Sequence, residues 1–362
     1  MKYRISDNSD SPAYLQLYRQ LKQDIVDTVY ACGCKLPSKR LMAEDLGIST
    51  VTVEHAYYLL CDEGYVESRE RSGYYVIFRT NDGFAASSNE HKLPAATVNN
   101  THGTEPTFPF SVLAKTMRRV LSIHGEAMLD RSPSKGLSEL RTVICEYLAR
   151  NRGINASPEQ IIVGSGAEYL YGLIVELLGR DKIYGIESPS YHKIEQVYRT
   201  KDVKYEFLHL GSDGISSTDL CLTSANVLHT TPFRSYPTGV TASASKLHEY
   251  ILWSGKGERY IIEDDFESEF SVSSKPTDTL FAQSRLDNVI YLNTFSKTVS
   301  PSLRLGYMVL PMHLTPMFDE KLGFYSCTVP TFEQYVLTEL ISNGDFERHV
   351  NRVRRMKRQE MK

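Results

Sequence analysis

Cysteine is scarce in this sequence, and the cysteines that are present are scattered. Six of them stand at positions 32, 34, 61, 145, 221 and 327, and only Cys32 and Cys34 lie close together. Because no second close pair completes a zinc site, we expect no bound metal. Scattered, unpaired cysteines are typical of a reducing compartment, which predicts a cytoplasmic protein.

Long apolar runs and a strong charge imbalance are also missing. The sequence has no stretch of about 18 apolar residues, so we expect no membrane span. Its first residues lack the apolar core of a secretory signal. The formal net charge of −3 gives no sign of nucleic-acid binding, so any DNA contact has to come from a local patch. The length of 362 residues predicts more than one domain.

The first 78 residues carry a pattern of three helices and two strands. Residues 11–30 predict an amphipathic helix, because Leu17, Leu21, Ile25 and Val29 recur every four residues. Two further helices and then two strands are expected at residues 39–46, 50–63, 64–67 and 73–77. This order predicts a winged helix-turn-helix, in which the second helix of the pair enters the major groove of DNA.

Residues 11–78 also resemble the GntR type of bacterial regulator. The matching motifs are Leu36-Pro-Ser-Lys-Arg40, Leu41-Met-Ala-Glu-Asp-Leu-Gly47 and Ser49-Thr-Val-Thr-Val53. The resemblance implies contacts with a double-stranded DNA operator from Ser38, Arg40, Ser49, Thr50 and Thr52 and, on the wing, from Arg69, Arg71 and Gly73.

This segment departs from its relatives in charge. Many relatives carry arginine where this chain has Thr50, and more basic residues where it has Glu54 and His55. Acidic residues slightly outnumber basic ones here, so we expect DNA binding that is weak or depends on a dimer. A winged helix used only for protein contact is the alternative.

After a polar linker at residues 79–104, strands and helices alternate. Strands are expected at residues 160–163, 182–186, 204–208, 226–229, 260–263, 288–292 and 305–310, and helices at 137–150, 168–178, 244–253 and 331–360. The last of these reads as one long helix with a strongly basic, solvated end. Such alternation predicts an α/β domain with a mainly parallel sheet covered by helices.

Three motifs in this second domain point to a site for a phosphorylated cofactor. Lys297 stands in a hydroxyl-rich turn after an apolar run, and Arg304 follows seven residues later. The expected strand at residues 260–263 ends in carboxylates. A glycine turn, Val163-Gly-Ser-Gly-Ala-Glu168, separates a strand from a helix, so its backbone N–H groups can point at a phosphate.

Together these motifs resemble the pyridoxal-phosphate (PLP) site of fold-type I aminotransferases. The resemblance implies that Lys297 forms the aldimine with PLP and that Asp264 pairs with the pyridine nitrogen, with Asp265 as the close alternative. It implies further cofactor contacts from Ser165, Gly166, Ala167, Tyr191, Tyr236, Thr294, Ser296 and Arg304. Phe266 is a departure, because related regulators carry a tyrosine there that hydrogen-bonds the ring oxygen. The family's substrate-clamping arginine belongs to a small C-terminal domain, which we expect to be missing after Lys362.

A GntR-type winged helix followed by an aminotransferase-like domain is similar to the MocR type of PLP-binding transcriptional regulator. The expected domains are the winged helix at 1–78, the linker at 79–104, the PLP-binding large domain at 105–325 and the start of a bridging helix at 326–362. The resemblance implies a homodimer that responds to PLP and to an amine or amino-acid effector, without useful turnover. A working aminotransferase and a degraded relative that binds DNA without cofactor are the two alternatives.

Overall fold

The computed structural model describes residues 3, 5–6, 11–69, 72–78, 108–271 and 279–360. The chain divides into two compact units, Met1–Thr101 and His102–Lys362, and each is described by itself. The predicted linker at 79–104 lies outside the described residues.

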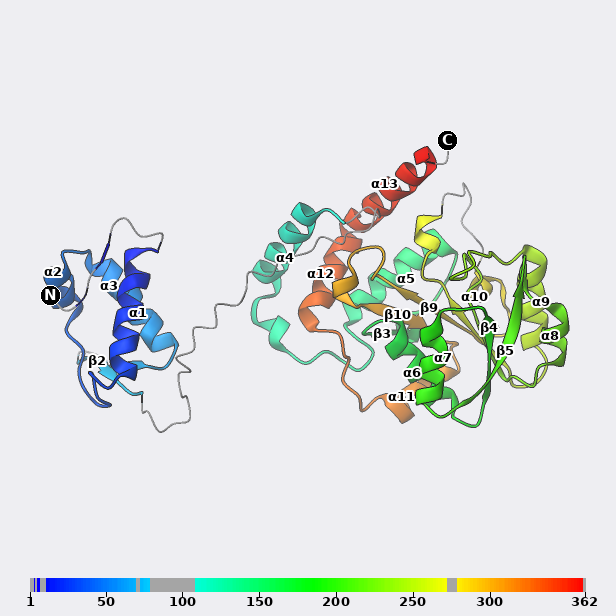
Figure 1. The fold of residues 1–362 in the computed structure, drawn as a ribbon, viewed down its shortest axis with the longest axis horizontal. Helices are drawn as coiled ribbons and strands as arrows, with labels where there is room; N and C mark the ends of the chain where they lie inside the picture. The colour runs from blue at the N-terminus through cyan, green and yellow to red at the C-terminus, as the bar shows by residue number, and fades with distance from the viewer. Residues whose placement is uncertain are drawn as a thin grey trace. The chain divides into compact units, whose positions relative to one another are not determined.

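The N-terminal unit is a winged helix-turn-helix, as predicted (Figure 1). Its elements are α1 (Ala13–Val26), α2 (Lys39–Leu46), α3 (Thr50–Asp62), β1 (Val66–Arg69) and β2 (Gly73–Val76). The two strands pair antiparallel and form the wing. Helix α1 ends at Val26, four residues before the end of the helix predicted for residues 11–30. Val29 therefore lies beyond the helix and is 54% exposed.

Two serines determine where α2 and α3 begin. The Ser38 hydroxyl accepts a hydrogen bond from the Leu41 N–H at 3.3 Å, and the Ser49 hydroxyl accepts one from the Thr52 N–H at 3.0 Å. Each side chain thereby satisfies one of the backbone donors that a helix leaves free at its first turn. Gly47, in the left-handed region at φ 66°, ends α2 and makes the turn between the two helices.

An eight-stranded sheet forms the centre of the second unit. Its strand order is β3-β10-β9-β8-β7-β4-β5-β6. The strands are β3 (Ile161–Gly164), β4 (Ile183–Ser188), β5 (Lys204–Gly211), β6 (Gly214–Ile215), β7 (Val227–Thr230), β8 (Tyr260–Asp264), β9 (Val289–Thr294) and β10 (Gly306–Val309). β10 runs antiparallel to both of its neighbours, and β6 is an antiparallel edge strand. The sheet is therefore mixed but mainly parallel, in agreement with the predicted α/β class.

Helices cover both faces of this sheet (Figure 1). One face packs against α6 (Ala167–Leu178), α7 (His192–Thr200) and α11 (Leu314–Leu322). The other packs against α4 (Phe110–His124), α5 (Ser138–Arg152), α12 (Thr331–Ser342) and α13 (Asp345–Glu360), and against α9 (Ala244–Ser254). Successive strand residues alternate between these layers: Ile261 and Ile262, for example, belong to different core clusters. The short elements are α8 (Ser217–Leu222), α10 (Leu280–Gln283), η1 (Gly125–Leu129), η2 (Pro158–Gln160), η3 (Ser268–Phe270) and η4 (Pro301–Leu303).

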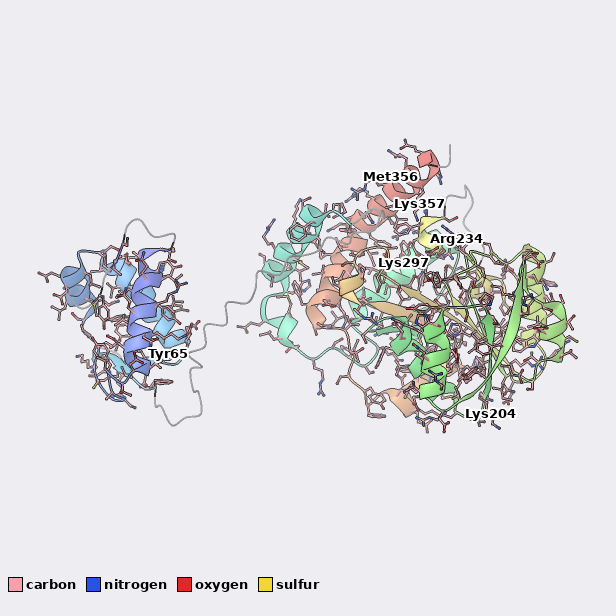
Figure 2. All side chains as sticks on the ribbon, in the orientation of Figure 1. Tyr65, Lys204, Arg234, Lys297, Met356 and Lys357 are labelled. Carbon is pink, nitrogen blue, oxygen red and sulfur yellow. The ribbon has the colours of Figure 1, made fainter. Side chains whose placement is uncertain are left out.

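The expectation of one long helix over residues 331–360 is wrong. Two helices, α12 and α13, meet at Gly344, whose φ of 71° interrupts the helical backbone. The basic end of α13 is also not simply solvated. Val353 is fully buried, the Arg354 Nε donates to the Glu269 carbonyl at 2.5 Å, and Lys357 lies 5.0 Å from the centre of the Phe270 ring (Figure 2). Helix α13 is thus part of the packed domain.

Across the described ranges, no helix is both long and apolar enough to span a bilayer.

Candidate functional site

A cavity of about 320 Å³ opens at the carboxyl ends of the parallel strands β3, β8 and β9. This edge is where open α/β sheets place their ligands. Nine of the cofactor residues predicted from the sequence line the cavity: Gly166, Ala167, Tyr191, Tyr236, Asp264, Thr294, Ser296, Lys297 and Arg304. Ser165 does not line it, because its hydroxyl accepts a hydrogen bond from the Thr328 hydroxyl at 3.1 Å instead.

The two adjacent aspartates at the end of β8 have different surroundings. Asp264 lines the cavity, and its Oδ2 accepts a hydrogen bond from the buried Tyr171 hydroxyl. Its Oδ1 is buried and has no hydrogen-bond partner among the described residues. The Oδ2 of Asp265 accepts hydrogen bonds from the Arg152 guanidinium and from the Tyr291 hydroxyl, the latter at 2.8 Å. Its Oδ1 is likewise buried without a partner among the described residues, but Asp265 does not line the cavity. Of the two alternatives, only Asp264 offers a carboxylate to the cavity.

Lys297 lies just after β9 and contacts a carboxylate that the sequence analysis missed. Its Nζ donates to Glu267 Oε1 at 2.5 Å, and it lies 4.5 Å from the centre of the Phe266 ring. The other oxygen of Glu267 lies 3.6 Å from Arg234 Nε. Glu267 thus stands between two cations, of which Lys297 lines the cavity. Lys297 has to give up this contact before its nitrogen can act as a nucleophile.

The turn between β3 and α6 forms an anion cradle. Gly166 has a φ of 96°, and a Cβ built on it would lie 3.3 Å from Arg304 Nη2, so a side chain here would crowd the guanidinium. Helix α6 begins directly after Gly166, and its first residue, Ala167, also lines the cavity. The free N–H groups and the dipole at this end of the helix favour an anion.

The Glu168 carboxylate is paired with two cations at this cradle. Its carboxylate accepts from Arg304 Nη2 at 2.9 Å and from Lys193 Nζ at 2.7 Å. Burial by itself would raise the pKa of Glu168, but the hydrogen bond from Lys193 and the charge of Arg304 outweigh it, so the pKa is lowered. An anionic side chain therefore lies where a phosphate is expected. Sequence reasoning missed it because Arg304 lies 136 residues away along the chain.

Glu187, at the end of β4, holds the loop that carries Tyr236. It is buried and accepts hydrogen bonds from the Thr230 hydroxyl, from the Thr231 N–H at 3.1 Å and from the Ser235 hydroxyl at 2.7 Å. Burial raises the pKa of Glu187 to about 7, although these hydrogen bonds oppose the shift. The carboxylate is a positioning group for the cavity wall.

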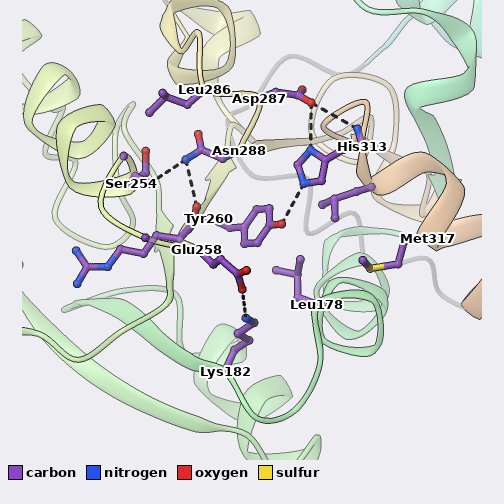
Figure 3. Close-up of a pocket in the computed structure, with 14 residues that line it drawn as sticks. Leu178, Lys182, Ser254, Glu258, Tyr260, Leu286, Asp287, Asn288, His313 and Met317 are labelled. Carbon is purple, nitrogen blue, oxygen red and sulfur yellow. Dashed lines mark hydrogen bonds and ion pairs between the residues drawn. The ribbon is translucent and has the colours of Figure 1, made fainter.

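A larger cavity of about 430 Å³ lies at the opposite, amino-terminal edge of β4, β8 and β9 (Figure 3). Within it the Tyr260 hydroxyl lies 3.0 Å from His313 Nε2, and His313 Nδ1 lies 3.1 Å from Asp287 Oδ2. The Asn288 amide donates to two backbone carbonyls, those of Ser254 and Arg259. These polar groups are hydrogen-bonded within the protein and connect the start of α11 to the sheet. We assign them a structural role.

In the winged helix, most of the predicted DNA contacts lie on the surface. Ser38, Arg40, Ser49, Thr50 and Arg69 are exposed, whereas Thr52 and Gly73 are half-buried. Arg71 lies outside the described residues. Arg69 is paired with Glu67 at 3.3 Å and lies 4.5 Å from the centre of the Tyr75 ring, so the wing holds this guanidinium in place.

Comparison with known families matches both units. Residues 13–76 match the bacterial regulatory proteins of the gntR family, and residues 97–362 match aminotransferase class I and II. An uncharacterized HTH-type transcriptional regulator of Bacillus subtilis, YdeL, is 32% identical over 97% of this chain and 78% of its own length. The chain belongs to the MocR-type GntR regulators.

Other MocR-type proteins match over a similar span. The probable rhizopine catabolism regulatory protein MocR of Rhizobium meliloti is 28% identical over 96% of this chain and 76% of its own. The pyridoxine biosynthesis regulator PdxR of Corynebacterium glutamicum is 27% identical over 95% and 76%. The chain is thus a DNA-binding transcriptional regulator with an aminotransferase-like domain.

Solved aminotransferases share the fold of the second unit. The kynurenine aminotransferase of Pyrococcus horikoshii aligns over 70% of this chain and 66% of its own, with a TM-score of 0.63 and 25% identity. The α-aminoadipate aminotransferase LysN of Thermus thermophilus aligns over 70% and 66%, with a TM-score of 0.62 and 26% identity. The chain therefore spans slightly less than two thirds of the length of these enzymes.

Proposed function

We propose that this regulator binds PLP covalently through Lys297 and uses it as a sensed ligand, not as the cofactor of a turnover reaction. The observation that carries the proposal is the unpaired Oδ1 of Asp264, which is buried at the cavity wall. A buried carboxylate oxygen without a donor is costly, so such a group calls for a partner. The N–H of a pyridinium ring is a donor of the right kind.

The other residues of the cavity fit the same group. Arg304, Thr294 and Ser296 offer a guanidinium and two hydroxyls for a phosphate, next to the open cradle at Gly166. Tyr191 and Tyr236 supply aromatic walls, with ring centres 6.1 Å apart. When bound, PLP supplies an electron-withdrawing ring and an aldehyde that takes up amines. Two relatives support the proposal, because one is named for pyridoxine biosynthesis and the other for rhizopine catabolism.

One residue argues against efficient turnover. Phe266 cannot donate the hydrogen bond that a tyrosine gives to the ring oxygen in related regulators. We therefore expect the site to bind an amine or amino acid without sustained chemistry.

The proposed homodimer has support in the second unit. Helix α4 and the turn after it expose large apolar side chains, including Phe110 at 79% and Leu129 at 86%. Exposed apolar groups of this size mark association surfaces. Replacing both by aspartate should convert a dimer to a monomer in sedimentation experiments, whereas a wild-type chain that sediments as a monomer would refute the dimer.

Borohydride reduction tests the cofactor assignment. The full chain is mixed with PLP, reduced and mapped by mass spectrometry, and the label is expected on Lys297 alone. Lys297→Ala should lose the label. Lys182→Ala is the matched control, because Lys182 lines the other cavity, at the amino-terminal edge of the sheet, and its replacement should leave the label in place. A label that persists on another lysine in Lys297→Ala refutes the assignment, and a wild-type chain without label favours a regulator that binds DNA without cofactor.

A turnover assay tests the other half of the proposal. The chain is incubated with PLP, a panel of amino acids and 2-oxoglutarate, and no sustained glutamate formation is expected. In parallel, PLP should change the affinity of the wild-type chain for its operator but not that of Lys297→Ala. Glutamate formation that requires Lys297 would show that the chain is a working aminotransferase.

A further inference from the structure

Helix α3 presents an uncharged, partly apolar face. Its core side is formed by Val53, Ala56, Tyr57 and Leu60, which are all fully buried. On the opposite side Val51 is 61% exposed and Tyr58 is 66% exposed, and His55 lies between them along the helix. Neither lysine nor arginine occurs in α3, so the second helix of this helix-turn-helix carries no permanent positive charge.

This composition leaves α3 without the side chains that make the commonest specific contact to DNA. A guanine is usually recognised through its O6 and N7 atoms by a bidentate arginine or by a lysine. The first turn of α3 has Thr50, Val51 and Thr52 instead, and the Thr52 hydroxyl is already held by Ser49 at 2.8 Å. The chemical groups left to meet base edges there are the Val51 methyls and the Thr50 hydroxyl.

Of the two acidic residues of α3, Glu54 lies near the first turn and is paired with a lysine of the preceding helix, whereas Asp62 lies at the other end. Glu54 accepts a hydrogen bond from Lys39 of α2 at 2.5 Å. This pair removes a negative charge from the side of α3 that has to approach a polyanion. It also keeps the Glu54 carboxylate occupied, so Glu54 is poorly placed to accept from a cytosine amino group. The apolar character of Val51 is therefore the main chemical signal at this end of the helix.

We propose that Val51 contacts thymine methyl groups in the major groove, so that the operator half-site is recognised at A·T pairs through apolar contact and not at guanines. Thymine is the base that presents a methyl group in the major groove. Val51 lies in the first turn of α3, the end of a recognition helix that meets base edges. This inference rests on DNA binding by the winged helix and is independent of PLP.

The test begins by selecting a site for the full chain from random DNA, with and without PLP. Each thymine of the selected half-site is then replaced by deoxyuridine, which removes one methyl group and nothing else. At one or two positions the affinity of the wild-type chain should fall about fourfold, as expected for one buried methyl-sized group. In Val51→Ala the same replacements should have almost no further effect, because the partner of the methyl is already gone.

Two control variants separate base recognition from folding. Val29→Ala removes a similarly exposed valine of the same unit, at 54% exposure, and should keep the full response to deoxyuridine. Val51→Thr keeps the shape of the side chain and should lose part of the response. Thermal unfolding checks that each variant is folded.

Several outcomes would overturn the inference. Deoxyuridine effects that are equal in the wild-type chain and in Val51→Ala place the methyl contact elsewhere. A selected half-site dominated by guanine contacts, or no sequence preference at all, is equally incompatible with it. If Val51→Ala alters self-association but not DNA binding, the exposed face of α3 is a protein contact. A selected site that is the same with and without PLP leaves the inference intact, even if PLP binding itself fails.

Discussion

The Glu168 carboxylate and the Arg304 guanidinium are hydrogen-bonded at 2.9 Å in the cavity where a phosphate is expected. The bond joins the first turn of α6 to the loop before β10. Any phosphate that binds there has to share or displace the Glu168 side chain. We therefore expect the pair to lower the affinity of the cradle for anions.

Glu168→Gln is expected to strengthen PLP binding. Removing the negative charge frees Arg304 and Lys193, and half-exposed ion pairs of this kind stabilise by about 0.2–1 kcal/mol, so the Kd should fall by a factor of about 1.4 to 5. Fluorescence or absorbance titration measures the change. Glu176→Gln is the matched control on the same helix, because Glu176 pairs with Arg180 and Lys201 away from the cavity. An unchanged or weaker affinity in Glu168→Gln would contradict this prediction.

Phe266→Tyr should tighten PLP binding and shift the visible absorbance. The added hydroxyl can donate to the ring oxygen, and one such hydrogen bond contributes about 1 kcal/mol, which is about fivefold in affinity. Spectra recorded between pH 6 and pH 9 report the change in the environment of the ring. If the spectrum and the Kd both stay at wild-type values, the side chain at position 266 does not face the ring oxygen.

Glu54→Gln should increase non-specific affinity for DNA. The substitution releases Lys39 from its 2.5 Å contact and makes it available to a phosphate. One additional phosphate contact steepens the dependence of log K on log salt by about 0.9. Titrations at several salt concentrations measure this slope, with Glu67→Gln on the wing as a comparison. An identical slope in Glu54→Gln and the wild-type chain would show that Lys39 already contacts DNA or does not reach it.

The stability of the aminotransferase-like unit should fall as the pH rises. Burial raises the pKa of Glu187 from its ordinary value of 4.5 to about 7, so the folded state keeps a proton that the unfolded state has lost. The contribution is fully present below about pH 4.5 and is lost as the pH rises through about 7, a total loss of about 3 kcal/mol. Glu187→Gln should remove this part of the pH dependence in thermal unfolding. The measured quantity is the difference between the wild-type chain and Glu187→Gln in the pH dependence of stability. The total dependence is not sufficient, because burial also raises the pKa values of Glu263 and Glu269.

Local features of the fold could be predicted from the sequence because neighbouring residues determine them. The starts of α2 and α3 follow from Ser38 and Ser49, whose side chains cap helices within three residues. The break at Gly344 was missed, because the apolar pattern continues through it and a glycine inside a helical pattern does not by itself show a positive φ.

In the candidate site too, local motifs could be predicted from the sequence, whereas contacts between distant residues could not. Motifs on single turns predicted a shared site for Lys297, Arg304 and Asp264, and all three line one cavity. Asp264 and Asp265 could not be told apart in sequence, because the decision depends on Tyr171 and Arg152, which are 93 and 113 residues away. Glu267 lies next to the predicted motif but offered no signal of its own, since only the folded loop brings it to Lys297.

The position of the two aspartates at the end of β8 has a mechanical consequence. They are consecutive on one backbone, which continues the ladder as far as the Asp265 N–H, 2.9 Å from the Leu292 carbonyl. One faces the cavity, and the other is anchored to Arg152 at the end of α5. We therefore expect a ligand that shifts Asp264 to shift the contact between Asp265 and Arg152 as well. A fluorescent label on α5 would report this change without touching the ligand.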